Sequence, residues 1–301
     1  MFITLRHFHI EKPSVIVCHE VKSSVIAWPY TIFAHIPLIS VVHDDPFAFE
    51  YNPNDPYFSA SRFMKCIASL ILTSVLNNSD TVIATTDKIA KRVKRKTTAN
   101  NIISIPYGID ISLPRNPFCK RTHLLSIATW SQFRQPERYL DFIPSESSQI
   151  SLIMAGYWQD DALKNQFIKS VRNRNLQDKV KIVEDFREEE LLTLFESAIV
   201  FLRFGFNESG TGQGLFEAVG HGCPIITNPE IGGADILLDG VHGFIIDPKD
   251  TKLVRQKIMD IMTSQALWEE LSRNCLKLAT SKGWHHYLCD FQTSILASLT
   301  S

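Results

Sequence analysis

Short runs of apolar and β-branched residues alternate along this chain with longer segments that have the spacing of amphipathic helices. In the first part of the chain the short runs lie at 14–20, 37–44, 80–86 and 101–108. Helical patterns lie between them at 58–77 and 87–97. The segment 111–123 then holds two prolines and has no periodicity, which is typical of a linker between domains.

The same alternation begins again after this linker and is more complete there. Strand-like runs lie at 123–129, 149–156, 179–185, 198–204, 223–228 and 242–248. Helical patterns lie at 160–173, 187–196, 213–221, 232–238, 250–262, 265–281 and 285–299. Strands that alternate with helices build parallel sheets, so the chain is predicted to be an α/β protein with two Rossmann-like lobes in series. Ligands of such sheets bind beyond the carboxyl ends of the strands.

Size and composition fit two ordinary lobes and argue against several other classes of protein. The chain has 301 residues, enough for two hydrophobic cores, and its net charge of −1 gives no attraction to nucleic acid. The six cysteines form no CxxC pair, so we expect reduced thiols, no metal site and a cytoplasmic protein. The apolar run CIASLILTSVL (66–76) is too short for a bilayer, which takes about 20 residues.

The segment KIAKRVKRK (88–96) carries six positive charges in nine residues. Ile89 and Val93 share one side of this predicted helix, so the segment has two interpretations. It is either a plain exposed helix, or a helix that lies on anionic lipid and holds the protein peripherally at the inner membrane face.

The stretch NESGTGQGLFEAVGHG (207–222) places two carboxylates on either side of a glycine-rich turn. It follows the predicted strand 198–204 and opens a predicted helix, and free amides at a helix N-terminus bind phosphate. Carboxylates instead bind sugar hydroxyls, by charge-assisted hydrogen bonds. The combination suggests a sugar nucleotide. The alternatives are a plain loop in which Glu217 stabilises the helix, and a dinucleotide fingerprint, which the GxGxG spacing disfavours.

The residues around this loop form a longer series. Glu217-Ala218 is followed by HGCPII (221–226), IGGAD (231–235) and GFIIDP (243–248). In order and spacing this series resembles the retaining GT-B glycosyltransferases of family 4, and a weaker resemblance extends over nearly the whole chain from residue 14. It implies two Rossmann-like lobes that face a central cleft. We expect an acceptor-side lobe at 1–112, a nucleotide-sugar lobe at 120–282, and a terminal helix at 283–301 that returns to the first lobe.

The resemblance also implies a role for each matching residue in the second lobe. Glu217 would hold the ribose of the donor, while Glu208, one position earlier than the family spacing, would lie beside the donor sugar. The donor phosphates would lie on the turn formed by Gly210, Thr211, Gly212, Gln213 and Gly214.

Further implied residues lie on other loops. Arg134 stands where the family has a lysine that stabilises the leaving diphosphate, whereas Thr129 replaces the expected arginine. Arg138 is a substitute for that arginine or part of a solvated helix face. Phe186 and Arg187 would contact the nucleotide base. In the first lobe, His43 would reach the donor sugar or its pyrophosphate, its alternative being a structural histidine.

The implied function is that of a retaining hexosyltransferase in glycan biosynthesis. It would move a sugar from a UDP- or GDP-linked donor to a hydroxyl on an unknown acceptor, either lipid-linked or a protein glycan, with no metal and no cofactor. The first lobe looks shorter than in the family: it is minimal, completed by a partner subunit, or begins late. Two other functions stay open, a non-catalytic nucleotide-sugar-binding subunit and a nucleotide-sugar epimerase.

Overall fold

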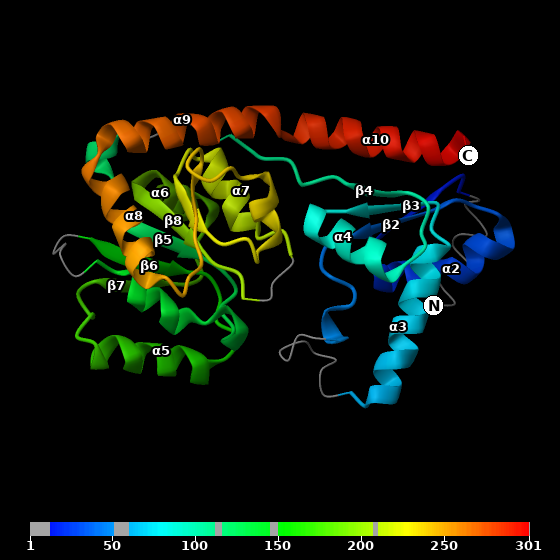
Figure 1. Ribbon diagram of the computed structural model, residues 1–301, viewed down its shortest axis with the longest axis horizontal. Helices are drawn as coiled ribbons and strands as arrows, with labels where there is room; N and C mark the ends of the chain where they lie inside the picture. The colour runs from blue at the N-terminus through cyan, green and yellow to red at the C-terminus, as the bar shows by residue number, and fades with distance from the viewer. Residues whose placement is uncertain (1–12, 51–59, 112–115, 145–149, 207–209, 301) are drawn as a thin grey trace. The chain divides into compact units, whose positions relative to one another are not determined.

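The computed structural model describes residues 13–50, 60–111, 116–144, 150–206 and 210–300. The chain divides into two compact units (Figure 1). Unit 1 comprises the chain up to Gly108, the short segment 209–211, and the residues from Trp284 onward. Unit 2 comprises Ile109–Glu208 and Gly212–Gly283. Among the described residues, no helix combines the length and apolarity needed to cross a membrane.

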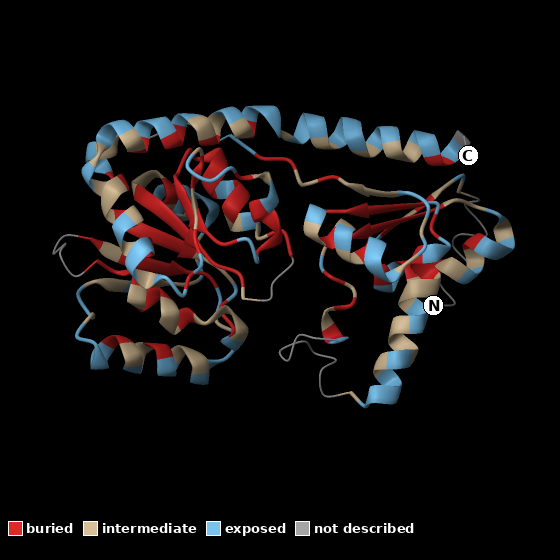
Figure 2. Cartoon of the chain, in the orientation of Figure 1, coloured by how far each residue is buried: buried red, intermediate tan, exposed pale blue. Residues whose placement is uncertain are grey.

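Unit 1 is built on a parallel sheet whose described strands pair in the order β1-β2-β3-β4. They are β1 (Ile16–His19), β2 (Leu38–Val42), β3 (Thr81–Ala84) and β4 (Ile102–Ser104). All four lie within the predicted strands. The central strands β2 and β3 are buried throughout, because helices cover both of their faces (Figure 2).

The helices of unit 1 lie on opposite faces of this sheet (Figure 1). One face carries α2 (Val21–Ala34), the short η1 (Ala48–Glu50), α3 (Arg62–Asn77) and α4 (Asp87–Lys96). The other face carries α10 (Trp284–Thr300), whose Tyr287, Phe291 and Ile295 pack on the core of that face. Four successive strands joined by right-handed crossovers place the three connecting helices on one side of the sheet, as seen for α2 to α4.

Helix α2 is absent from the sequence-based prediction, and its buried side explains why. The residues that face the sheet are Val21, Ser24, Ala27 and Thr31, which are small or polar. A helix with such a buried face shows little hydrophobic periodicity, and Pro29 inside it weakens the helical signal further.

The structure contradicts the interpretation of segment 88–96 as a helix whose apolar side lies on lipid. Ile89 and Val93 on α4 are fully buried in the core of unit 1, so the apolar side of the helix faces protein. Arg92 and Lys96 form ion pairs with carboxylates on or before η1, at Asp45 and Glu50.

Unit 2 contains a parallel sheet in which the described strands pair in the order β10-β9-β8-β5-β6-β7. They are β5 (His123–Ile127), β6 (Ser151–Ala155), β7 (Val180–Val183), β8 (Ala198–Arg203), β9 (Ile225–Thr227) and β10 (Gly243–Ile245). The chain builds outward from β5 to β7, then returns to β8 on the other side of β5. The sheet therefore has a topological switch point between β5 and β8.

Helices enclose this sheet and complete the hydrophobic core of unit 2. They are α5 (Asp161–Asn173), α6 (Glu188–Ser197), α7 (Gln213–Gly220), α8 (Thr251–Thr263) and α9 (Gln265–Ser281). Shorter 3₁₀ segments are η2 (Phe118–Lys120), η3 (Gln132–Arg134), η4 (Pro136–Phe142) and η5 (Gly232–Ile236). The predicted helix at 232–238 is thus a 3₁₀ turn, and η4 was not predicted.

Candidate functional site

The switch point in unit 2 brings together the loops that follow β5 and β8. Both strands are parallel neighbours, so these loops leave the same edge of the sheet. The loop after β8 is anchored by Asn228, whose side-chain amide exchanges two hydrogen bonds of 2.8 Å with the backbone of Gly205. In parallel α/β sheets, a crevice outside the switch point is the usual place for a ligand.

Helix α7 begins at this edge, and glycines determine how closely it approaches the sheet. Gly212 caps the helix in the left-handed conformation, with φ 62°, which favours glycine. A methyl group on Gly214 would lie 3.1 Å from the Phe201 ring of β8, and 3.5 Å from the carbonyl oxygen of Ile127 on β5. The first turn of α7, with Gln213 and Gly214, therefore lies against the ends of β5 and β8. The N–H groups of Gln213 and Gly214 have no acceptor within the helix.

Glu217 lies one turn further along α7, four residues after Gln213. Its side chain is exposed, yet the protein around it displaces part of the solvent and raises the pKa of its carboxyl. A carboxylate placed one turn beyond a helix N-terminus is able to accept hydrogen bonds from a ligand whose anionic group lies on that N-terminus.

The loop after β5 contains the predicted cation. Arg134 ends η3, is half-buried, and donates from its guanidinium to the carbonyl oxygen of Thr129 at 2.5 Å. Arg138 on η4 lies over the ring of Phe206, which follows β8, with 5.3 Å from Cζ to the ring centre. Arg138 thus contacts the loop after β8 and does not simply occupy a solvated helix face.

Phe186 and Arg187 follow β7, at the edge of the sheet and two strands away from β5. The backbone N–H of Arg187 donates to Glu190 at 2.8 Å, which fixes the start of α6. Phe186 is half-buried and Arg187 is exposed.

The predicted residues before α7 are only partly described. Glu208 lies outside the described residues. Gly210 and Thr211 are both buried and group with unit 1. There the Thr211 hydroxyl donates to the Thr85 hydroxyl at 3.1 Å, and Thr85 donates in turn to the carbonyl oxygen of His43 at 3.2 Å.

His43 follows β2 in unit 1 and belongs to a column of stacked rings. The ring centre of His19, which ends β1, lies 5.3 Å from that of His43, and the ring centre of Tyr107 lies 5.6 Å from that of His43. Both ring nitrogens of His43 have partners: Nδ1 contacts the Tyr107 hydroxyl, and Nε2 lies 3.1 Å from Nδ1 of His19.

The protonation of this column follows from its surroundings. Burial, with smaller contributions from Tyr287, Glu20 and Asp44, raises the pKa of Tyr107 to about 12, so the hydroxyl keeps its proton and donates to His43 Nδ1. Burial and the His19 ring lower the pKa of His43, which favours the neutral ring. Neutral His43 then carries its proton on Nε2 and donates to His19.

Two members of this column, His19 and Tyr107, were missed by the sequence analysis, although the sequence contains a signal for one of them. The runs VCHE and VVHD both end a predicted strand with a histidine followed by an acid. The carboxyl ends of neighbouring parallel strands lie at the same edge of the sheet, which brings the two histidines together. Within the described parts of the chain, no three His, Cys, Asp or Glu side chains are grouped in a way that would hold a metal ion.

Known proteins resemble the chain in both sequence and structure. The family model for glycosyl transferases group 1 matches residues 124–278, and that for glycosyltransferase family 4 matches residues 2–113. Spore coat protein SA of Bacillus subtilis is 23% identical over 169 residues, which are 54% of this chain and 45% of that protein. Sucrose-phosphate synthase of Zea mays is 27% identical over 84 residues, or 28% of this chain and 8% of that protein. The chain spans less than half the length of either relative.

Solved structures agree on the fold. Anabaena HepE in complex with UDP has a TM-score of 0.80 at 14% identity, covering 98% of this chain and 81% of that one. Sucrose-phosphate synthase from Thermosynechococcus elongatus has a TM-score of 0.81 at 18% identity, covering 98% and 76%. With the first model matching more than half of its residues, the chain belongs to the glycosyl transferases group 1 family, and its two Rossmann-like units have the GT-B fold.

Proposed function

We propose that the protein is a glycosyltransferase that moves a sugar from a nucleotide-sugar donor to a hydroxyl acceptor with retention of configuration. The observation that carries the proposal is the start of α7, where glycine-capped amides lie at the switch point and Glu217 follows one turn later. Amides at a helix N-terminus suit a diphosphate, and a carboxylate at this distance suits the ribose hydroxyls. The Anabaena HepE structures contain UDP and UDP-glucose, which supports a uridine donor over a guanosine donor here.

Arg134, Gln213 and Gly214 take part in the transfer step itself. The bond between the sugar C1 and the phosphate oxygen breaks, and a bond from C1 to the acceptor oxygen forms on the same face. The acceptor proton passes to the departing diphosphate, whose negative charge Arg134 and the amides of Gln213 and Gly214 stabilise. Loss of one such fixed group costs on the order of a hundredfold in rate.

The remaining predicted residues bind and orient the donor. In this proposal Glu208 would bind the donor sugar, and His43 would bind the sugar or its pyrophosphate. Phe186 and Arg187 contact the base from the end of β7. The reaction needs no metal at this step, because the cation and the amides together balance the charge that develops.

Nucleotide binding provides the first test. Thermal unfolding of the full chain with UDP, GDP and ADP should show stabilisation by one of them, about 2.7 kcal/mol at a ligand concentration a hundred times the dissociation constant. Glu217→Ala should abolish most of this shift. Glu270→Ala, at an exposed position on α9, is the matched control and should retain it. An unchanged shift in Glu217→Ala would contradict the assignment of the ribose site.

Turnover separates this proposal from a non-catalytic binding subunit, which the replacement of the expected arginine by Thr129 favours. The enzyme should slowly hydrolyse its donor when no acceptor is present, and Arg134→Ala should reduce this rate at least about a hundredfold. A wild-type protein that binds the nucleotide but releases no free sugar would support the binding subunit instead. Release of an epimerised free sugar would point to an epimerase.

A further inference from the structure

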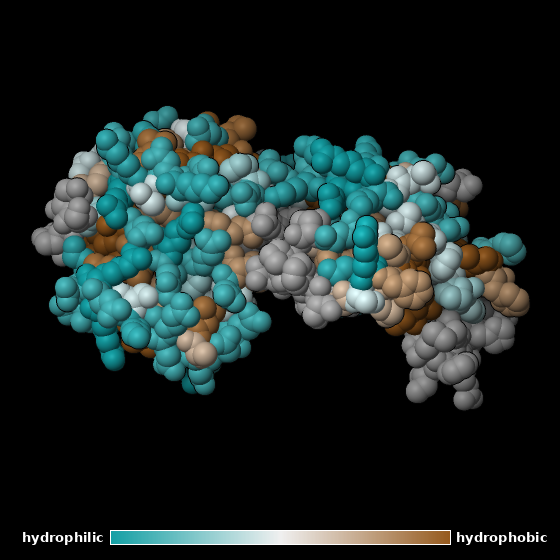
Figure 3. All heavy atoms as spheres, turned by 60° about the horizontal axis from the view of Figure 1, so that its bottom comes forward, coloured by the Kyte–Doolittle hydropathy of each residue, from teal (hydrophilic) through white to brown (hydrophobic). Residues whose placement is uncertain are grey.

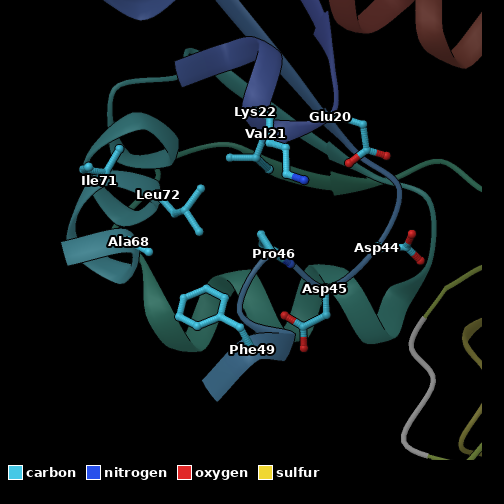
Figure 4. A pocket seen from close by; sticks show the side chains of 10 residues that line it. All are labelled: Glu20, Val21, Lys22, Asp44, Asp45, Pro46, Phe49, Ala68, Ile71 and Leu72. Carbon is cyan, nitrogen blue, oxygen red and sulfur yellow. The ribbon is translucent and has the colours of Figure 1, made fainter. Parts of the chain in front are cut away.

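Unit 1 contains a cavity of about 390 Å³ that none of the proposed donor-binding residues line (Figure 4). Its volume lies in the range of small-molecule sites, about 300 to 1,000 Å³. It opens beside the carboxyl ends of β1 and β2, the functional edge of a parallel sheet. Its lining includes the charged side chains of Glu20, Lys22 and Asp44 and the apolar side chains of Phe49, Ile71 and Leu72.

The two ends of this cavity differ in chemistry. Figure 4 shows the carboxylates of Glu20 and Asp44 at one end, and the side chains of Phe49, Leu72 and Ile71 at the other. Glu20 and Asp44 are exposed, so a ligand is able to reach them. Phe49 is buried, so its ring is held in place by the surrounding protein and forms the apolar side of the cavity. A ligand that fills both ends must itself have a polar and an apolar end.

The backbone conformation of Glu20 is a second, independent mark of a functional position. Its φ of 72° and ψ of 138° are strongly unfavourable for a residue with a side chain. Such conformations cost about 1 to 3 kcal/mol and cluster at functional sites. Burial, then the nearby Asp44, raise the pKa of the Glu20 carboxyl, so the two acids act on each other.

The apolar end of the cavity continues onto the outside of α3. Ile71 both lines the cavity and is 42% exposed, and Leu70, Phe63 and Met64 are still more exposed. Their positions repeat at intervals of seven, so they lie along one side of the helix. Figure 3 shows hydrophobic residues gathered on the face of unit 1 that carries α3. An apolar chain longer than the cavity would therefore find further apolar surface along α3.

We propose that this cavity binds an amphiphile, with a hydroxyl-bearing, uncharged head between Glu20 and Asp44 and a hydrocarbon chain against Phe49, Leu72 and Ile71. The head is uncharged rather than anionic because the carboxylates of Glu20 and Asp44 outnumber the ammonium group of Lys22, which also lines the cavity. Hydroxyls bind carboxylates by charge-assisted hydrogen bonds, and each methylene buried at the apolar end strengthens binding.

One part of this proposal rests on the proposed function: the bound amphiphile would be the acceptor of the transferred sugar. Glu20 and Asp44 directly follow His19 and His43, so the head would lie beside the histidine column. The acceptor class would then be a glycolipid or a polyol attached to a hydrocarbon chain. Binding of the amphiphile itself does not depend on any reaction.

The test uses octyl glucoside below its micelle concentration, added to the full chain without nucleotide and followed by NMR or calorimetry. Methyl glucoside has the same head without the chain, and octyl sulfate has the same chain with an anionic head. We expect octyl glucoside to bind at least about tenfold more tightly than methyl glucoside, because its chain buries several more methylenes. Octyl sulfate should bind more weakly than octyl glucoside.

Two variants locate the site. Ala68→Phe fills the apolar end, and its matched control is Ala266→Phe at an exposed position on α9. Asp44→Asn removes one carboxylate with little change of shape, and its control is Asp178→Asn, also exposed. We expect each cavity variant to weaken octyl glucoside binding by about threefold or more, and each control to bind like wild type.

Three results would overturn the proposal: equal affinities for methyl and octyl glucoside, octyl sulfate as the tighter ligand, or wild-type binding by both cavity variants. The thermal-shift test with nucleotides distinguishes these results from a failure of the proposed function. If the protein binds octyl glucoside at this cavity but binds no nucleotide, the amphiphile site is supported and the proposed transferase function is contradicted. If the protein binds UDP but not octyl glucoside, the proposed transferase function is supported and the amphiphile site is contradicted.

Discussion

At the scale of single residues, the partners of His43 determine which of its ring nitrogens carries the proton. Tyr107 donates to Nδ1 and therefore holds the proton on Nε2. Tyr107→Phe removes this donor without removing the ring. We expect the Nδ1-protonated tautomer to gain about fivefold in population, the equivalent of one hydrogen bond near 1 kcal/mol.

The measurement is the nitrogen chemical shift of the His43 ring in the two proteins at pH 8. Tyr287→Phe is the matched control, because Tyr287 packs on the ring of Tyr107, with 6.0 Å between ring centres, and belongs to the same aromatic cluster. An unchanged tautomer ratio in Tyr107→Phe would show that Tyr107 only packs against His43 and does not orient its proton.

Glu20 provides a test of backbone strain. Glycine tolerates φ 72° whereas alanine does not, so Glu20→Gly should be more stable than Glu20→Ala by about 1 kcal/mol. At Ile26, an exposed interior position of α2, the order should reverse, since glycine costs a helix about 1 kcal/mol relative to alanine. Urea denaturation measures both pairs. The same order at both positions would argue against strain at Glu20.

His123 makes the stability of unit 2 depend on pH. It begins β5 and is buried, with Nε2 3.0 Å from the carbonyl oxygen of Leu194. Burial lowers its pKa to about 4, to which the positive charges of Arg121 and Lys181 also contribute, although the hydrogen bond to Leu194 opposes the shift. The unfolded state, with a histidine pKa near 6.5, then binds more protons than the folded state between pH 6.5 and 4.

Stability should therefore be complete above pH 6.5 and fall as the pH drops through this window, by up to about 3 kcal/mol. His123→Gln keeps a donor of similar size and does not titrate, so its unfolding free energy should lose most of this slope. The measurement is urea denaturation at steps between pH 7.5 and 4.5. A variant with the wild-type slope would show that other groups cause the loss.

At the scale of elements, both ends of α7 lie close to the backbone of unit 2, and the position of the helix requires glycine there. Gly220 lies in the last turn, where alanine would normally favour a helix by about 1 kcal/mol. Here a methyl group would lie 1.9 Å from the carbonyl oxygen of Asp110, closer than any real contact. Gly220→Ala should therefore destabilise unit 2 by about 2 kcal/mol or more, because the helix must move.

Gly240→Ala is the control for this prediction. Gly240 has φ 72° but no atom within 4 Å of the added methyl group, so it should show the conformational cost alone, about 1 kcal/mol. Thermal unfolding of both variants makes the comparison. A Gly220→Ala protein as stable as wild type would mean that the segment at Asp110 yields easily.

The elements that the sequence predicted well have a regular apolar pattern. All described strands lie within the predicted runs, and β8, which is covered on both faces, is continuously apolar up to Arg203. Helices α5 and α9 have apolar residues repeated on one side. Helix α2 was missed because Ser24 and Thr31 occupy its buried side.

Sequence-based prediction had similar limits at the candidate site. The glycine-rich turn and Glu217 follow from local sequence, since their geometry depends on a single strand–helix connection. The partners of His43 come from other segments of the chain, because His19 ends β1 and Tyr107 follows β4. The cavity between α2 and α3 depends on how these helices pack. Such contacts between distant segments leave no periodic signal in one sequence.

At the scale of the whole molecule, the two units do not each consist of one continuous segment. Helix α9 belongs to unit 2, yet α10, which begins three residues after α9 ends, completes the core of unit 1. Its Phe291 packs with the core of β2 and β3, and Ser298 lies 2.8 Å from the Thr81 hydroxyl. Without α10, one face of the unit 1 sheet would lose much of its apolar cover.

Phe291→Asp should therefore destabilise unit 1 by about 2 to 3 kcal/mol and leave unit 2 nearly unchanged. Leu288→Asp, on the exposed side of the same helix, is the matched control and should have little effect. Hydrogen exchange resolves the units separately: amides of β2 and β3 should exchange faster in Phe291→Asp, whereas those of β5 and β8 should keep their protection. Equal loss of protection in both sheets would show that the two units unfold as one, and that α10 transmits stability between them.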